Sequence, residues 1–266
     1  MAFTISITLQ KGGTAKTTTA VTLASILGEK HNRVLLLDMD SQVNASLASG
    51  FDTQLSPSIT DVLAGNCDIK AAIHSSTYYD IVLGDQYLAN LESIDPDELN
   101  PTLLRDIIHQ VADEYDYIII DTPPALGNIL KQCMMASDGL IIPIEARPFA
   151  LNGLDALQET IESVQKHNKD LQVLGILLVK YNSRTVLNRQ VAEALVDRAE
   201  SMQTTMFDSY IREGIAVPES QILGRPLIDY APTSKPAQDY RAFANEVIKR
   251  VRGEEDGDEG LYEETN

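Results

Sequence analysis

The sequence predicts an α/β domain in which a mostly parallel, doubly wound sheet is flanked by helices. Apolar runs alternate with stretches of helical periodicity along the chain, and this order implies parallel strands joined by right-handed crossovers. The expected strands are residues 3–9, 33–37, 80–83, 117–120, 139–143 and 171–179. Several are apolar throughout, as strands covered on both faces are. The expected helices are residues 16–28, 100–113, 150–167, 185–200 and 236–251.

Length and charge indicate one domain with an acidic end. The chain has 266 residues and no linker rich in Pro, Gly or Ser, so we expect a single domain over residues 1–252. Its net charge of −18 argues against a nucleic-acid partner. The charge is uneven, however, because residues 166–252 hold 13 Lys and Arg against 10 Asp and Glu. Residues 253–266 hold 7 acidic residues and no Lys or Arg, and we expect them to be a disordered tail.

No part of the sequence indicates a membrane segment or a redox centre. Its apolar stretches are too short to span a bilayer, and the N-terminus begins with strand-like sequence rather than a signal peptide, so we expect a cytoplasmic protein. Cys67 and Cys133 lie far apart and lack ligand spacing. We expect both to be buried as small apolar residues.

Residues 11–18, Lys-Gly-Gly-Thr-Ala-Lys-Thr-Thr, lie between the first expected strand and the first expected helix. The common phosphate-loop pattern, G-x-x-x-x-G-K-[ST], fails because Gln10 and Ala15 occupy its two glycine positions. A deviant form, K-G-G-x-x-K-[ST]-T, matches and adds a second lysine. A glycine-rich turn that binds nothing would not explain this strand-to-helix context. We expect nucleotide contacts from Lys11, Gly12, Gly13, Thr14, Ala15, Lys16, Thr17 and Thr18.

Each residue type in this loop suits phosphate chemistry. The two glycines let successive backbone N–H groups turn toward phosphate oxygens at a helix N-terminus. Lys16 supplies a point charge, and Thr17 supplies a hydroxyl for Mg²⁺. The loop therefore predicts a nucleoside triphosphate and magnesium as ligands.

Aspartates follow two of the expected strands, at the edge where open α/β sheets bind ligands. Asp38 and Asp40 follow the second strand, and Asp121 follows residues 117–120. Each could instead be a helix cap or a turn former. With the phosphate loop upstream, we expect Asp121 to support the metal beside Thr17. We expect Asp40 to orient the attacking water or contact the metal, and Asp38 to support both. The expected catalytic residues are Lys11, Lys16, Asp40 and Asp121.

Taken together, these motifs resemble the ParA/Soj family of partition ATPases, in the deviant phosphate-loop group that also holds MinD. The motifs are the loop at 11–18, Leu-Asp-Met-Asp-Ser-Gln-x-Asn at 37–44, and Ile-Asp-Thr-Pro-Pro-Ala-Leu-Gly at 120–127. Later segments, at 142–154, 175–185 and 224–240, agree in order and spacing. The segment at 224–240 separates this family from others that share the deviant loop.

The resemblance implies a magnesium-dependent ATPase that forms a sandwich dimer with ATP. It further implies that the dimer binds non-specific DNA, associates with the nucleoid, and hydrolyses ATP slowly until a ParB-like centromere-binding partner stimulates it. Lys11 is expected to cross the dimer interface to the other subunit's nucleotide, because two triphosphates buried face to face need extra positive charge. The adenine is expected near Asn182, Ile211 and Arg212.

The chain departs from the family pattern mainly where the family binds DNA. Val186, Glu213 and Ala216 occupy positions where that pattern has arginine. Ala15 replaces a common glycine, which is acceptable if that position is right-handed helical. The remaining candidates for phosphate contacts are Arg184, Arg189, Arg212, Arg225, Lys235, Lys249, Arg250 and Arg252. These residues could instead form a solvated basic face.

The chief rival is a membrane-cycling ATPase like MinD, which would end in a basic amphipathic helix. Residues 236–252 do combine an apolar stripe with basic residues. Such a stripe is more often packed on its own domain, and the acids that follow would be repelled by anionic lipid. We therefore expect no membrane partner. The same loop would also serve a metal-cluster carrier, a metabolic ligase, or a scaffold that uses ATP only as a switch.

Overall fold

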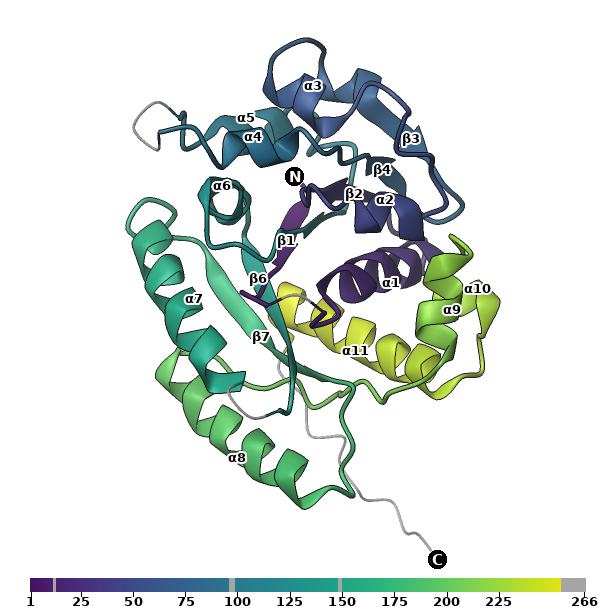
Figure 1. Ribbon diagram of the computed structural model, residues 1–266, viewed down its shortest axis with the longest axis vertical. Coiled ribbons are helices and arrows are strands. Elements are labelled where there is room, and N and C mark those ends of the chain that lie inside the picture. Colours follow the sequence, from purple (N-terminus) through teal and green to yellow (C-terminus); the bar gives the residue numbers. More distant parts are fainter. Residues whose placement is uncertain (12, 96–98, 148–149, 255–266) are drawn as a thin grey trace, which may run out of the picture.

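Seven strands form one sheet in the order β3-β4-β2-β5-β1-β6-β7 (Figure 1). The computed structural model describes residues 1–11, 13–95, 99–147 and 150–254. Neighbouring strands are parallel except for the edge pair of β3 and β4. The strands are β1 (Phe3–Ile7), β2 (Val34–Asp38), β3 (Ile73–Ser75), β4 (Asp80–Val82), β5 (Tyr117–Asp121), β6 (Gly139–Glu145) and β7 (Gln172–Val179). The predicted fold class is confirmed.

Helices cover both faces of this sheet (Figure 1). One face packs against α1 (Lys16–Glu29) and α11 (Lys235–Arg252), with α2 (Asn44–Ala48), α9 (Ala216–Ile222) and α10 (Leu227–Tyr230) beside them. On the other face lie α3 (Ile59–Leu63), α4 (Leu88–Leu91), α5 (Leu103–His109), α6 (Asn128–Met135), α7 (Ala150–Gln165) and α8 (Val186–Ser201). A short 3₁₀ helix, η1 (Ile69–Ala72), precedes β3. Because both faces are covered, β2, β5 and β6 are buried along their whole lengths, as their apolar sequences predict.

Strand register brings the polar strand ends together. Asp38 of β2 lies opposite Asp121 of β5, and Ile7 of β1 lies opposite Asp121 on the other side. The chain leaves β1 shortly after Ile7 and enters the phosphate loop, so the loop and both aspartates share one edge of the sheet. This edge is where a doubly wound sheet places its ligand.

Sequence periodicity found the long elements and missed the short ones. The antiparallel edge strand β3 and the helices α2, α3, α4, α6, α9 and α10 were not expected. Each has eight residues or fewer, which is too short for a period of 3.6 to stand out. The helix expected at 100–113 is confined to α5, because residues 110–114 form turns. Of the two cysteines, Cys133 is buried as expected, whereas Cys67 is partly exposed.

The last helix packs on its own domain. Tyr240, Phe243 and Val247 of α11 are almost fully buried, and the Tyr240 hydroxyl lies 3.1 Å from Thr19 Oγ1 of α1. Gly253 ends the helix in the left-handed conformation that glycine favours, with φ 66°. None of the helices within the described residues is long and apolar enough to cross a membrane. Residues 255–266, which hold most of the predicted acidic tail, lie outside the described part of the chain.

Candidate nucleotide-binding site

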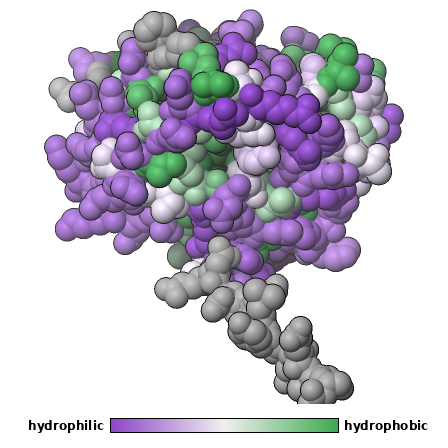
Figure 2. Space-filling model, turned by 90° about the horizontal axis from the view of Figure 1, so that it is seen from below, coloured by the Kyte–Doolittle hydropathy of each residue, from purple (hydrophilic) through white to green (hydrophobic). Residues whose placement is uncertain are grey.

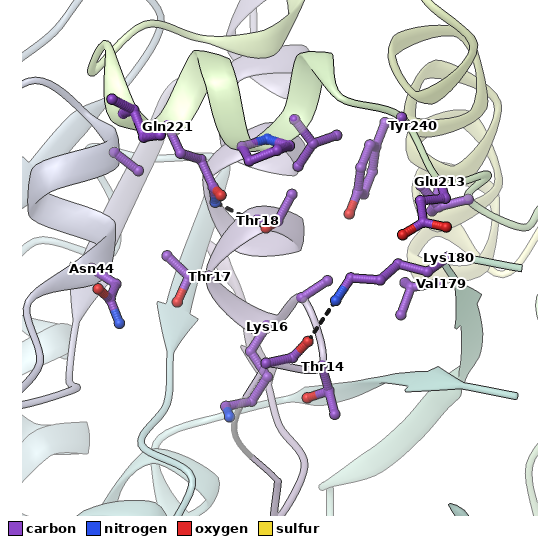
Figure 3. A pocket seen from close by; sticks show the side chains of 18 of the residues that line it. Thr14, Lys16, Thr17, Thr18, Asn44, Val179, Lys180, Glu213, Gln221 and Tyr240 are labelled. Carbon is purple, nitrogen blue, oxygen red and sulfur yellow. Dashed lines mark hydrogen bonds between the residues drawn. The ribbon is translucent and has the colours of Figure 1, made fainter. Parts of the chain in front are cut away.

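A cleft of about 1100 Å³ opens at the carboxyl edge of the sheet, above the phosphate loop (Figure 3). It is bounded by the start of α1, by α2 and α9, and by the loop that precedes α9. The predicted residues that line it are Gly13, Thr14, Ala15, Lys16, Thr17, Thr18, Asp40, Ile211 and Arg212. Lys11 lines a smaller cavity of about 300 Å³ next to the loop, and Gly12 lies outside the described residues.

Two residues of the phosphate loop have left-handed backbone conformations. Gly13 has φ 78°, which glycine adopts without strain. Ala15 has φ 61° and ψ 23° and is the N-cap of α1. The condition under which alanine would be acceptable at position 15, a right-handed helical backbone, is therefore not met. The left-handed conformation costs a non-glycine residue about 1–2 kcal/mol, so this chain holds its phosphate loop under local strain.

The two lysines of the loop lie in different environments. Lys16 is buried, with 6% of its surface exposed, and its Nζ donates to the carbonyl oxygen of Lys11 at 3.2 Å. Burial lowers the pKa of Lys16, while the nearby Asp121 and Asp40 partly oppose that shift. Lys11 is exposed. Lys16 thus belongs to the interior of its own cleft, and the side chain of Lys11 is open to the surroundings.

Asp121 has the contacts expected of a metal-site carboxylate. It is fully buried, and its Oδ2 accepts a hydrogen bond from the Thr17 hydroxyl at 2.7 Å. Its Oδ1 is buried too and has no hydrogen-bond partner among the described residues. Burial, together with the neighbouring Asp38, raises the pKa of Asp121 well above its usual range. A buried oxygen without a donor beside a threonine hydroxyl fits a hydrated Mg²⁺, which prefers oxygen ligands.

Asp38 holds the segment that carries Asp40. Its carboxylate is fully buried and accepts hydrogen bonds from the backbone N–H and hydroxyl of Ser46 at 2.8 and 2.7 Å, and from the N–H of Asp40 at 3.2 Å. Burial raises its pKa to about 6. Asp40 itself lines the cleft, and its Oδ1 accepts from the N–H of Gln42 at 3.0 Å. Asp38 therefore positions the Asp40 segment rather than facing the cleft.

The far end of the cleft suits an aromatic base. Its wall is mostly apolar, with Ile211, Ile215, Val217 and Pro218 among the lining residues. The Arg212 guanidinium is paired with Asp239, with Nη2 and Oδ1 2.5 Å apart. Asn182 is not among the lining residues. Its side-chain oxygen accepts from the N–H of Arg184 at 3.1 Å and so stabilises the turn before α8.

Among the lining residues that the sequence did not single out, Lys180 and Gln221 have side chains that hydrogen-bond to residues 13–18. Lys180 follows β7, and its Nζ reaches the carbonyl oxygen of Gly13 at 2.9 Å (Figure 3). Gln221 of α9 donates to the hydroxyl of Thr18 at 2.9 Å (Figure 3). Lys180 carried a usable signal, because it directly follows a strand that ends at the same edge of the sheet as the aspartates. Gln221 carried none, since α9 itself was not expected.

The basic candidates for DNA contacts differ in how their side chains are used. Arg184, Arg189, Arg225, Lys235, Lys249 and Arg252 are exposed. Arg250 is partly buried, and its guanidinium donates to the carbonyl oxygens of Leu174 and Met206 at 2.6 and 2.7 Å. The same group lies 4.0 Å from the centre of the Phe207 ring. Arg250 therefore joins α11 to β7 and to the segment that follows α8.

A phosphate loop between a strand and a helix, with buried carboxylates on neighbouring parallel strands, defines a P-loop nucleotide-binding protein. The sequence profile of a family described as an AAA domain matches residues 2–173. The Bacillus subtilis sporulation initiation inhibitor protein Soj is 36% identical over 252 residues, which cover 91% of this chain and 97% of that protein. The Myxococcus xanthus chromosome partitioning protein ParA is 34% identical over 252 residues, covering 92% and 88%. The chain belongs to the ParA/Soj family of P-loop ATPases.

Solved structures agree with this assignment. Cobyrinic acid a,c-diamide synthase from Mycobacterium smegmatis, solved with a bound ATP analogue and magnesium, is 28% identical and has a TM-score of 0.78, covering 95% of this chain and 96% of that one. The septum site-determining protein MinD from Pyrococcus horikoshii, solved with Mg-ADP, is 26% identical with a TM-score of 0.76, covering 96% and 100%. The same fold therefore serves proteins with different biological roles, and the role of this chain has to be argued from its own residues.

Proposed function

We propose that this protein is a magnesium-dependent ATPase of DNA partition, which binds non-specific DNA as an ATP-bound dimer. The observation that carries the ATPase proposal is the pair of Thr17 and Asp121 beneath the phosphate loop, with the buried Oδ1 of Asp121 lacking a donor among the described residues. The relatives named for chromosome partitioning support the biological role. The choice of ATP and magnesium as ligands is supported by the two structural relatives that were solved with an ATP analogue and magnesium and with Mg-ADP.

The proposed hydrolysis needs positioning more than covalent chemistry. Lys16 would neutralise phosphate charge from within the cleft, and Thr17 and Asp121 would hold the magnesium ion. Magnesium, when bound, would neutralise charge on the terminal phosphates. Asp40 orients the attacking water, and Asp38 keeps the Asp40 segment in place through Ser46. Asp40 and the loop line one cleft, so a water beside Asp40 would lie within reach of the phosphates.

The placement of the two lysines supports the proposed dimer. Lys16 lies inside its own cleft, whereas Lys11 is exposed on the same loop. An exposed lysine at this point is available to a triphosphate on a second subunit, and its charge would offset the repulsion between two nucleotides. Nucleotide state and dimer state would then form one switch. In the ATP state we expect the protein on the nucleoid, with a ParB-like partner that speeds hydrolysis.

DNA binding is proposed for the exposed basic residues of the C-terminal third. Arg184 and Arg189 flank the start of α8, Arg225 follows α9, and Lys235 begins α11. Two copies of this set in a dimer would double the number of phosphate contacts and so strengthen binding steeply. Arg212 and Arg250 are weaker candidates, because Asp239 pairs the first and internal carbonyls bind the second.

The test is binding of the purified chain to non-specific duplex DNA with ATP, with ADP and without nucleotide, at fixed salt. We expect binding only with ATP, and its loss in Lys11→Ala. Lys30→Ala, which removes an exposed lysine at the end of α1, is the matched control and should bind as the unmodified protein does. Equal DNA binding in all three nucleotide states would contradict the proposal.

The membrane-cycling alternative has less support. The apolar residues Tyr240, Phe243 and Val247 of α11 are packed against the protein's own core and cannot also lie in a bilayer without that helix detaching. One face of the molecule is mostly hydrophilic, with its hydrophobic residues in separate groups (Figure 2). In the DNA experiment, vesicles containing anionic lipid serve as a parallel sample, and ATP-dependent binding to them instead of DNA would favour the membrane-cycling role.

A further inference from the structure

We propose that Lys180 is a positioning residue of the nucleotide site, which fixes the peptide between Gly13 and Thr14 while Glu145 holds its ammonium group in place. The inference rests on the proposed nucleotide binding and adds a residue from the opposite side of the cleft. Three segments meet here, namely the phosphate loop, the end of β6 and the residue after β7.

The ammonium group of Lys180 has two acceptors. Its Nζ lies 2.9 Å from the carbonyl oxygen of Gly13 and 2.6 Å from Oε1 of Glu145 (Figure 3 shows the contact with the loop). The Glu145 side chain is 10% exposed, and its other oxygen pairs with Arg147 Nε at 2.5 Å. Pairing with this nearly buried carboxylate holds the Lys180 ammonium group in place, whereas Arg147, whose side chain is 63% exposed, is the more solvent-exposed of the two cationic partners.

The backbone at Lys180 supports a positioning role. Its φ is 50°, a left-handed conformation that lysine rarely adopts and that clusters at functional sites. Ala15 and Val43, with φ 61° and 52°, have the same conformation, and Ala15 lines the cleft while Val43 lies between the lining residues Gln42 and Asn44. Lys180 therefore keeps this unfavourable backbone conformation at the point where its side chain reaches from the end of β7 to the phosphate loop.

The peptide that Lys180 holds is a functional one. In a trans peptide the carbonyl of Gly13 and the N–H of Thr14 point in opposite directions, so fixing the carbonyl also fixes the N–H. Thr14 belongs to the stretch of N–H groups that cradles the α- and β-phosphates in such loops. Gly13, at φ 78°, has little conformational restraint of its own. The hydrogen bond from Lys180 therefore restrains a peptide that would otherwise be free to rotate.

This role predicts a particular pattern of affinities. ADP and ATP share the α- and β-phosphates, so a disordered Gly13–Thr14 peptide should weaken both nucleotides by the same factor. A lysine that instead contacted the γ-phosphate directly would weaken ATP alone. Once nucleotide is saturating, the rate of hydrolysis should be unaffected, because Lys180 contacts neither the water nor the metal in this account.

The experiment measures dissociation constants for Mg-ADP and for a Mg-bound, non-hydrolysable ATP analogue by calorimetry, together with the turnover number at saturating ATP. For Lys180→Met, which keeps chain length and removes the charged donor, we expect both dissociation constants to rise about tenfold. Lys180→Arg keeps a donor and should restore most of the affinity. Arg147→Met removes the other cation on Glu145 without touching the loop, and it should bind both nucleotides as the unmodified protein does.

Three results would overturn the inference. Unchanged affinity in Lys180→Met, loss of ATP affinity alone, or equal loss in Arg147→Met would each contradict positioning through Gly13. If Lys180→Met fails to fold, Glu145→Gln is measured in its place. We expect its dissociation constants for both nucleotides to rise by about twofold to fivefold. If the unmodified protein binds neither nucleotide, the proposed function fails as well, which separates that result from a failure confined to Lys180.

Discussion

The phosphate side of the cleft and the basic C-terminal third use their charged residues in opposite ways. Around the phosphate loop, Lys16 and Asp121 are buried, and Asp121 keeps one oxygen without a donor among the described residues. In the C-terminal third, Arg212 and Arg250 are also partly buried, but protein groups bind their guanidinium groups. The Asp121 oxygen without a donor supports a ligand-binding role because it lies beside Thr17 at the phosphate loop, whereas bonding of an arginine to internal carbonyls and carboxylates indicates packing.

The strongest test of the phosphate side is Asp40→Ala. We expect the variant to bind ATP and dimerise normally, while the rate of phosphate release falls by about a hundredfold or more, because the attacking water loses its orienting carboxylate. Phosphate release measured with and without DNA checks this. Asp52→Ala, which removes an exposed aspartate beyond α2, is the control and should hydrolyse ATP normally. Normal turnover in Asp40→Ala would show that Asp40 plays no catalytic part.

Arg250→Ala tests the packing side of the comparison. The variant leaves the carbonyl oxygens of Leu174 and Met206 without their donor, so we expect the free energy of unfolding to fall by about 3 kcal/mol. Urea denaturation measures the change. The salt dependence of DNA binding should stay unchanged at a temperature where the variant is folded. A stable variant with weakened DNA binding would show that Arg250 contacts DNA and contributes little to packing.

Arg189→Ala tests an exposed arginine of the same C-terminal third, in contrast to the partly buried Arg250. Arg189 is exposed, and its guanidinium donates a hydrogen bond to the carbonyl oxygen of Ser183. Stability should change by less than about 0.5 kcal/mol. The slope of log affinity against log salt should fall by about one for each phosphate contact that is lost. An unchanged slope would remove Arg189 from the proposed surface.

Ala15→Gly tests the backbone strain of the phosphate loop and has the smallest expected effect. Glycine adopts φ 61° freely, so we expect the free energy of unfolding to rise by about 0.5–1 kcal/mol. Ala192→Gly, within the right-handed helix α8, should have the opposite sign and lower it by about 1 kcal/mol. Denaturation of both variants in urea measures the pair. Destabilisation by both would mean that the left-handed Ala15 carries no strain.

The sequence predicted the site residues of the phosphate side more completely than those of the C-terminal third, for physical reasons. The phosphate loop and its aspartates follow long buried strands, and parallel strands bring such ends to one edge of the sheet. The conformation of Ala15 was left open by the sequence, because local sequence does not fix the sign of φ. Asn182 lies outside the cleft, and the pairing of Arg212 with Asp239 could not be read from residues 27 positions apart. Short helices such as α9 left no periodic signal.

The central claim is that Lys16 serves its own subunit's ATP and Lys11 serves the partner's. The most direct measurement compares the ATP affinity of dilute monomers with sedimentation at saturating ATP, for Lys11→Ala and Lys16→Ala. We predict that Lys16→Ala loses ATP binding, whereas Lys11→Ala binds ATP nearly as the unmodified monomer does but fails to dimerise. A loss of monomer ATP affinity in Lys11→Ala as large as that in Lys16→Ala would contradict the account.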